Sequence, residues 1–211
     1  MLQTTKAIVL NAFAYNETSL ITKLYTKEFG LKGYIIKGVR KSKTSLSASL
    51  FQPLQLIEAE VYSNQRQSLQ VLKTATIIED LSFLRLNIVK STLTMFLTEV
   101  ISHSISGETS DQTMFDFLSD TIKSLNAADN SLLAEFHLHF MIDFADILGF
   151  NLINYDWEKD NEIAAFLNST TPTPTKIERN AILSTLISFY ELHITAGRKI
   201  LSHNVLHEIL N

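Results

Sequence analysis

The chain has 211 residues, of which 45% are hydrophobic and 19% are charged, and its formal net charge is -4. These proportions are typical of a globular protein with a buried core, and the length suits one large domain or two small ones. The absence of cysteine excludes disulfides, thiol nucleophiles and cysteine-ligated zinc, and it fits a cytoplasmic protein. No apolar run approaches the ~20 residues that span a bilayer, and the first residues lack the pattern of a signal peptide.

The charge is distributed unevenly along the chain. Residues 1–79 contain ten Lys and Arg against five Asp and Glu, whereas residues 80–211 contain eight against seventeen. This reversal favours two modules with different partners, with the basic module better suited to an anionic ligand. The alternative is that the second module is acidic for solubility alone.

The first eighty residues predict short strands that end at polar or glycine-containing turns. In the fourth strand, alternation places Tyr62 on the same face as Glu58 and Glu60. The strands are expected at Thr4–Ala14, Ser19–Thr26, Gly33–Val39, Leu54–Tyr62 and Ser68–Ile77. Five strands in so short a span are typical of a small closed barrel, and the OB-fold is a barrel of this kind that binds nucleic acid.

After Asp80 the apolar period becomes helical. Asp111 and Asn130 are expected to cap the second and third helices, and Gly149 is expected to end the third, which is apolar almost all round and therefore central. The second helix should bury an apolar set between Met114 and Leu125. The other helices are expected at Leu81–Ile105, Leu132–Leu148, Glu162–Leu167, Ile177–Ile194 and Asn204–Leu210, with an irregular loop at 151–176. The predicted fold class is therefore α+β, with a strand module at 1–79 and an α-helical module at 80–211.

The stretch Gly30–Leu46 combines a glycine-punctuated strand with a basic, serine-rich loop. It contains no carboxylate, histidine or cysteine, so it offers cations and backbone N–H groups but no acid–base or metal chemistry. It suits contact with a polyanion, and the alternative is a solvated loop with incidental charge. Its cations are Lys32, Lys37, Arg40, Lys41 and Lys43.

The N-terminal run resembles the opening of the RecO family of bacterial DNA repair proteins. The resemblance rests on a Y-x-E-x-S-L segment at Tyr15–Leu20, a T-x-x-x-G turn at Thr26–Gly30 and a basic G-x-R-K-S-K segment at Gly38–Lys43. It continues at Gln52–Leu54 and at the Glu79-Asp80 junction, and the C-terminal FYELHI and SHNVLHEIL are similar to the end of Bacteroidetes-type members. The resemblance rests on the ordered combination of these segments.

The resemblance implies an N-terminal five-stranded OB-fold barrel followed by an all-α domain. It also implies a cytoplasmic, nucleoid-associated recombination mediator that is not an enzyme and needs no cofactor. Such a protein binds single- and double-stranded DNA, anneals complementary strands and, with RecR, helps RecA onto strands coated by single-strand-binding protein. Many members carry a four-cysteine zinc site in the region matching 150–176, and that site is absent from this cysteine-free chain.

A single-strand binder needs cations along a groove and flat side chains on which bases stack. Phe13, Tyr25 and Tyr34 are possible stacking residues, although each is favoured as a core residue, because alternation does not settle which face is outward. If about five phosphates are contacted, the log–log salt slope should be near -3.5, from ~0.7 per phosphate. We expect mainly phosphate contacts with little base readout. The DNA-binding residues are predicted to be Arg40, Lys41 and Lys43, then Lys32 and Lys37, together with Lys23, Lys6 and Arg66.

Enzymatic and metal-binding interpretations have little support. His203 and His207 are four residues apart, but Asn204 stands where a zincin requires glutamate. His137 and His139 point to different faces of a helix, and no phosphate-binding or nucleophile motif is present.

The alternative to a DNA-binding protein is a protein-interaction scaffold with little direct DNA binding. In the resembled family the protein partners are RecR and the acidic, phenylalanine-ended tail of single-strand-binding protein. Such a tail needs an apolar notch beside a cation. The candidate cations of the helical module are Arg85, Lys90, Lys123, Arg179, Arg198 and Lys199, and the sequence does not choose among them.

Overall fold

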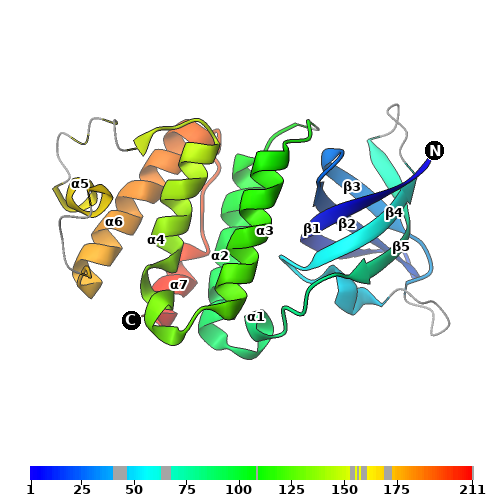
Figure 1. Ribbon diagram of the computed structural model, residues 1–211, viewed down its shortest axis with the longest axis horizontal. Helices are drawn as coiled ribbons and strands as arrows, with labels where there is room; N and C mark the ends of the chain where they lie inside the picture. The colour runs from blue at the N-terminus through cyan, green and yellow to red at the C-terminus, as the bar shows by residue number, and fades with distance from the viewer. Residues whose placement is uncertain are drawn as a thin grey trace. The chain divides into compact units, whose positions relative to one another are not determined.

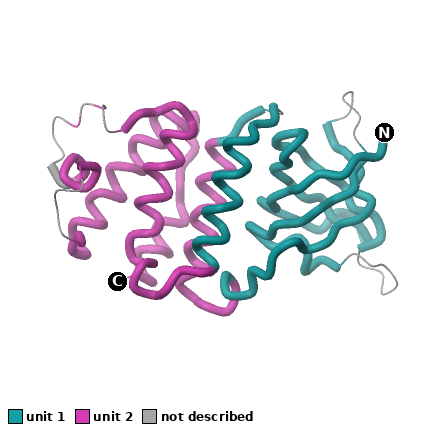
Figure 2. The backbone as a smooth tube through the Cα atoms, viewed as in Figure 1, with its two compact units in different colours: residues 1–84, 105–126 teal, residues 85–104, 127–211 magenta. Residues whose placement is uncertain are grey.

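The computed structural model describes residues 1–39, 47–62, 68–107, 109–152, 155, 157, 161–168 and 173–210. Within these residues the chain forms five strands followed by helices (Figure 1). Its packing divides it into two compact units (Figure 2). Unit 1 consists of Met1–Leu84 and Ile105–Asn126, and unit 2 consists of Arg85–Ser104 and Ala127–Asn211.

The strands of unit 1 close into a barrel in the order β1-β2-β3-β5-β4. Strands β3 and β5 run parallel, and the other neighbours run antiparallel. This is the five-stranded Greek-key barrel of the OB-fold, as expected. The strands are β1 (Leu2–Tyr15), β2 (Ser19–Thr26), β3 (Gly30–Ile36), β4 (Leu56–Tyr62) and β5 (Leu69–Ile77), with a 3-10 turn, η1 (Ala48–Phe51), between β3 and β4.

The third and fourth strands depart most from their predicted boundaries, while the first is longer by two residues at its start and one at its end and the fifth begins one residue later. The third strand begins at Gly30 and ends at Ile36, so Lys37 follows it instead of lying within it. The fourth strand begins at Leu56 because Leu54 has a φ of 59°, which is incompatible with extended backbone.

Strand β1 closes the barrel because it pairs with two neighbours, β4 along its first half and β2 along its second. The register shifts between Val9 and Asn11, and such a bulge bends a strand and exchanges its two faces. In the parallel contact between β3 and β5, Gly33 lies opposite Leu69, and an added Cβ at Gly33 would lie 3.3 Å from Leu69 Cδ1, which is a tight contact. The bulge thus lets β1 bend between its two neighbours.

The barrel interior is filled by the inward side chains of all five strands, as in other small barrels. Ile57, Ala59 and Val61, which alternation groups on one face of β4, point inside. The remaining interior residues are Ala7, Val9, Leu20, Leu24, Tyr34, Ile36, Val39, Phe51, Leu72 and Ala75.

Helix α3 (Gln112–Ala127) belongs to unit 1 with the barrel, up to Asn126. Asp111 caps it as expected, since the Met114 N–H donates to Asp111 Oδ1 at 3.0 Å. Five apolar side chains of α3 are buried, and the predicted Phe117 is half-buried. Tyr25 on the outside of β2 stacks on Phe115 with ring centroids 6.3 Å apart, so α3 covers this part of the barrel surface.

Unit 2 is helical, and α4 packs against both α2 and α6, which agrees with its predicted central position. The single helix expected from Leu81 is interrupted, because the Asn87 side chain accepts the N–H groups of Val89 and Lys90 and starts a new helix. The division between the units falls within α1 (Phe83–Leu86). The described helices of unit 2 are α2 (Ile88–Ser104), α4 (Asn130–Ile147), α5 (Asn161–Leu167), α6 (Lys176–Phe189), a π-helical turn η3 (Tyr190–Ile194) and α7 (His203–Ile209).

The two predicted ends of α4 have opposite outcomes. Asn130 is not the N-cap, because Asp129 occupies that position and Asn130 is the first helical residue. Gly149 does end the helix, with a φ of 89° and the Phe150 N–H donating to the Ala145 carbonyl at 2.8 Å.

The carboxylate of Glu99 on α2 binds the two residues that precede α7. Glu99 accepts hydrogen bonds from the Leu201 and Ser202 N–H groups and from the Ser202 hydroxyl. Partial burial alone would raise the pKa of Glu99, but these hydrogen bonds outweigh it and lower the pKa below its ordinary value.

Candidate nucleic-acid interface

One row of outward apolar side chains crosses all five strands of the barrel. Phe13 of β1 lies opposite Ile21 of β2, which lies opposite Ile35 of β3. Ile35 lies opposite Val71 of β5, which lies opposite Tyr62 of β4. Facing residues on neighbouring strands point to the same side of a sheet, so these five side chains form a continuous strip. We call this strip the apolar row.

The apolar row is open to solvent although its members are hydrophobic. Phe13 is 54% exposed and Tyr62 is 46% exposed, while Ile21, Ile35 and Val71 are half-buried. The solvated face of an antiparallel sheet normally carries polar side chains, and contiguous exposed apolar surface marks a binding site. The row therefore distinguishes this part of the barrel surface.

The structure separates the three aromatic candidates named from the sequence. Tyr34 is 1% exposed and belongs to the barrel interior. Tyr25 is 2% exposed, and its hydroxyl group donates a hydrogen bond to the Asp111 backbone carbonyl. Burial, together with the negative charge of Asp111, raises the pKa of Tyr25 to about 12. Both are packing residues, as favoured, whereas Phe13 lies in the open row.

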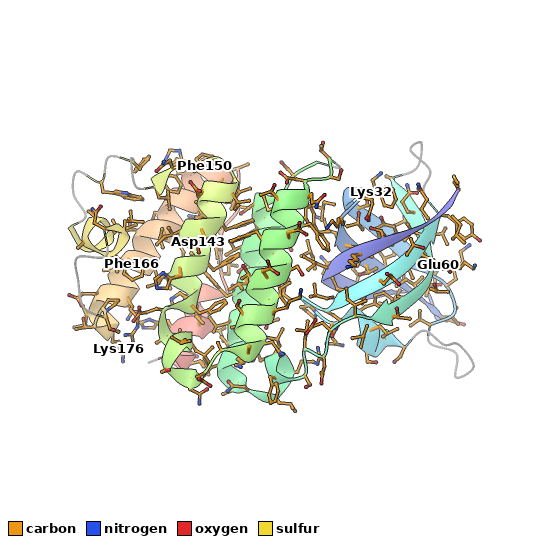
Figure 3. All side chains as sticks on the ribbon, in the orientation of Figure 1. Lys32, Glu60, Asp143, Phe150, Phe166 and Lys176 are labelled. Atoms are coloured by element: carbon orange, nitrogen blue, oxygen red, sulfur yellow. The ribbon has the colours of Figure 1, made fainter. Side chains whose placement is uncertain are left out.

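Three of the predicted cations lie on or beside strands β2 and β3 of the row. Lys23 lies opposite Asn11 and Gly33, one outward position along from Ile21. Lys37 is exposed and directly follows β3, while Lys32 is a half-buried residue of β3 that Figure 3 labels. Neither Lys23 nor Lys37 forms an ion pair with another described residue.

The carboxylates of the five strands are confined to β4. Glu60, labelled in Figure 3, accepts a hydrogen bond from Thr74 at 2.9 Å and lies 3.6 Å from Lys73 Nζ. Strands β1, β2, β3 and β5 contain lysines but no Asp or Glu. The surface around Ile21 and Ile35 is thus favourable to a phosphate backbone.

Lys6 lies in a different electrostatic setting. It is opposite Glu58 in the β1–β4 ladder and lines an open cleft of about 590 Å³ within unit 1. Lys27, also in this cleft, is 3.1 Å from Asp116 Oδ1. Lys6, Lys27 and Lys123 share the cleft with Glu58, Glu79, Asp116 and Asp120. A phosphate in the cleft would meet these carboxylates, which disfavours Lys6 as a DNA contact.

The remaining predicted DNA-binding residues lie outside the described part of the chain. Arg40, Lys41 and Lys43 fall within 40–46, between the end of β3 and η1, and Arg66 falls within 63–67, between β4 and β5. Their contribution stays a prediction.

Sequence reasoning missed Tyr62 as a candidate, although a signal for it was present. Alternation placed Tyr62 on the face opposite the core residues of its strand, and the structure confirms that it is outward. Placing Tyr62 in the apolar row also requires the strand register, which brings it opposite Val71 and cannot be read from the sequence.

The histidines of unit 2 do not gather into a site. His203 Nδ1 lies 2.6 Å from the Ile200 carbonyl oxygen, and His207 Nδ1 lies 3.1 Å from Asn180 Oδ1. His137 is buried, and burial lowers its pKa to about 3, with a smaller contribution from the charge of Arg179. Within the described ranges, no three His, Asp or Glu side chains are placed to hold a metal ion.

Comparison with known proteins agrees with this geometry. The family model "Recombination protein O N terminal" matches residues 1–81, and "Recombination protein O C terminal" matches residues 85–154. A DNA repair protein RecO from Azobacteroides pseudotrichonymphae is 30% identical over 100% of both chains. The chain belongs to the RecO family. RecO proteins of Christiangramia forsetii (33% identical, 99% of both chains) and Flavobacterium psychrophilum (29%, 98% of both chains) are also similar. The family places the chain among proteins of DNA repair and recombination.

The residues of this RecO-family chain do not fit the four-cysteine zinc site that the resemblance associates with many members. The chain has no cysteine, and aromatic packing occupies the described part of the corresponding region. Tyr155 and Trp157 lie with ring centroids 4.7 Å apart, and both pack on Phe189. The Trp157 indole N–H also donates to the Leu152 carbonyl at 2.8 Å.

None of the described helices has the length and apolar character needed to cross a bilayer.

Proposed function

We propose that this RecO-family chain is a non-catalytic recombination mediator that works in the cytoplasm at the nucleoid. It binds single- and double-stranded DNA, anneals complementary strands and, together with RecR, helps RecA replace single-strand-binding protein. The observation that carries the proposal is a solvent-open surface on an OB-fold barrel that combines apolar side chains with lysines on carboxylate-free strands.

The lysines supply attraction to any phosphate backbone. Lys23, Lys32 and Lys37 lie on or next to β2 and β3, the strands whose outer face binds oligonucleotides in OB-folds. Arg40, Lys41, Lys43 and Arg66 extend the same positive charge along the sequence. Because charge attraction does not depend on base sequence, this arrangement suits a protein that must act on any DNA.

Unit 2 is the proposed site of protein contacts. Several of its apolar side chains are exposed, including Met95 on α2 (43%), Val205 on α7 (44%) and Leu201 before α7 (64%). The acidic character of residues 80–211 should discourage DNA from binding over most of this surface. RecR and the tail of single-strand-binding protein are the proposed partners.

A strand-annealing assay tests the proposal. Two complementary oligonucleotides, one carrying a fluorophore and the other a quencher, would be mixed with the full chain at 50 and 200 mM salt, with and without single-strand-binding protein. We expect faster annealing in the presence of the chain, with a smaller acceleration at the higher salt. Annealing at the spontaneous rate under all conditions would refute the mediator proposal.

The alternative is a scaffold that binds partner proteins but little DNA. In that case purified RecR would bind the chain while oligonucleotides at 50 mM salt would not. A mobility-shift titration run beside a RecR pull-down would separate the two functions.

A further inference from the structure

We infer that the apolar row is a base-stacking platform that selects single-stranded over double-stranded nucleic acid. Phe13 and Tyr62 stack unpaired bases, and the aliphatic side chains between them support the strand. The inference deepens the proposed DNA binding and rests on it, but it changes the expected mode of contact. The sequence suggested mainly phosphate contact, whereas the exposed row supplies a surface for the bases.

The geometry of the row suits an extended strand. From Phe13 to Tyr62 it crosses four strand-to-strand steps, which at about 4.8 Å each gives a path of roughly 19 Å around the barrel. An aromatic residue stands at each end, and Ile21, Ile35 and Val71 lie between them. A path of this length is consistent with a site of about four nucleotides, the lower end of the range for OB-folds.

The charges beside the row favour nucleic acid over a second apolar protein surface. Lys23 lies next to Ile21 on the outer face, and Lys37 lies two residues beyond Ile35. No carboxylate occurs on β1, β2, β3 or β5. Near the far end of the row, Glu60 is close to Lys73. An anionic chain with flat apolar bases matches this combination of cations and open rings.

Stacking explains a preference for single strands. The bases of a duplex are stacked on one another, so their faces are not available to Phe13 or Tyr62, and only phosphate contacts remain. A base stacked on a side-chain ring keeps its pairing edge free, because the ring covers its face. Such a strand is held in a form that a complementary strand can still pair with, as annealing requires.

The test compares the affinities of variants for a fluorescent oligo(dT) strand and for a duplex of the same length. We expect Phe13→Ala and Tyr62→Ala each to weaken binding to oligo(dT) by roughly 5- to 150-fold, the range of one lost base stack. Affinity for the duplex should stay unchanged. Phe13→Leu, which keeps an apolar side chain without a ring, should also bind oligo(dT) more weakly. Phe83→Ala is the matched control, since Phe83 is 59% exposed and belongs to unit 1.

Phe13→Trp provides a direct readout at the same position. The natural chain has a single tryptophan, so its fluorescence gives the baseline. In Phe13→Trp we expect additional fluorescence that oligo(dT) quenches and the duplex does not. Thermal unfolding of every variant checks that the barrel is intact.

The possible outcomes distinguish failure of the stacking platform from failure of the proposed DNA binding. Wild-type affinity for oligo(dT) in Phe13→Ala and Tyr62→Ala, with the wild-type chain binding DNA, would overturn the stacking platform alone and leave the row as a protein-docking surface. Equal losses for oligo(dT) and duplex would also overturn it. A wild-type chain that binds neither form would refute the proposed function itself.

Discussion

Removing two lysines beside the apolar row should reduce the salt dependence of DNA binding by a calculable amount. Each phosphate contact with a single strand contributes about 0.7 to the log–log salt slope. Neither Lys23 nor Lys37 forms an ion pair with a carboxylate in the described part of the chain, so each is available to contact one phosphate. Lys23→Ala/Lys37→Ala should therefore lower the magnitude of the slope by about 1.4, from the ~3.5 expected for five contacts.

The difference is large enough to measure. Across a fourfold change in salt, from 50 to 200 mM, a slope difference of about 1.4 means that the wild-type chain loses roughly sevenfold more affinity than the double variant. Fluorescence anisotropy with oligo(dT) at four salt concentrations gives both slopes. Lys6→Ala is the matched control, because Lys6 lies opposite Glu58 in a cleft rich in carboxylates, and its slope should equal that of the wild type.

Two results would refute this reasoning. A double variant with the wild-type slope would mean that Lys23 and Lys37 contact no phosphate. A slope change in Lys6→Ala as large as that in the double variant would mean that phosphates contact lysines over the whole barrel surface and not only those beside the row.

Three further predictions concern unit 2. Glu99→Gln should lower the free energy of unfolding by about 1–3 kcal/mol at pH 7, since the hydrogen bonds that Ser202 donates to residue 99 lose their charge assistance, and urea denaturation measures this. Because the pKa of Glu99 is lowered by folding, its contribution is present above pH 4.5 and is lost as the pH falls through the folded value, so the variant and the wild type should converge in acid. The pKa of His137 is about 3 in the folded chain and 6.5 in the unfolded chain, so the unfolded chain takes up a proton at a higher pH and the free energy of unfolding should fall between pH 6.5 and 3. His137→Leu should flatten the pH dependence of the free energy of unfolding in this range. An unchanged pH dependence would contradict a neutral buried ring. Tyr190→Phe should cost about 1 kcal/mol, because the buried hydroxyl donates to the Met141 carbonyl at 2.6 Å, and an unchanged urea midpoint would show that this bond adds nothing.

Local patterns in the sequence were enough to predict the elements but not the apolar row. Strand alternation divided β4 into the two faces that the structure shows, and the helix signals at Asp111 and Gly149 were confirmed. Asn130 failed as a cap because the adjacent Asp129 took the position, a difference of one residue that propensity does not resolve.

The orientation of Phe13 depends on a feature that alternation cannot reveal. Ala7 and Val9 point into the barrel, so strict alternation along β1 would place Phe13 inside as well. The bulge between Val9 and Asn11 exchanges the faces, with the result that Ala12 packs on the core and Phe13 turns outward. The partners of Phe13 across the barrel follow from strand register, which is a tertiary property.

Photo-crosslinking would locate the DNA most directly. The full chain would be irradiated with an oligonucleotide of 4-thiothymidine, and the crosslinked peptides would be identified by mass spectrometry. The account predicts crosslinks in the peptides that contain Phe13 and Tyr62. Crosslinks confined to residues 127–211 would contradict it.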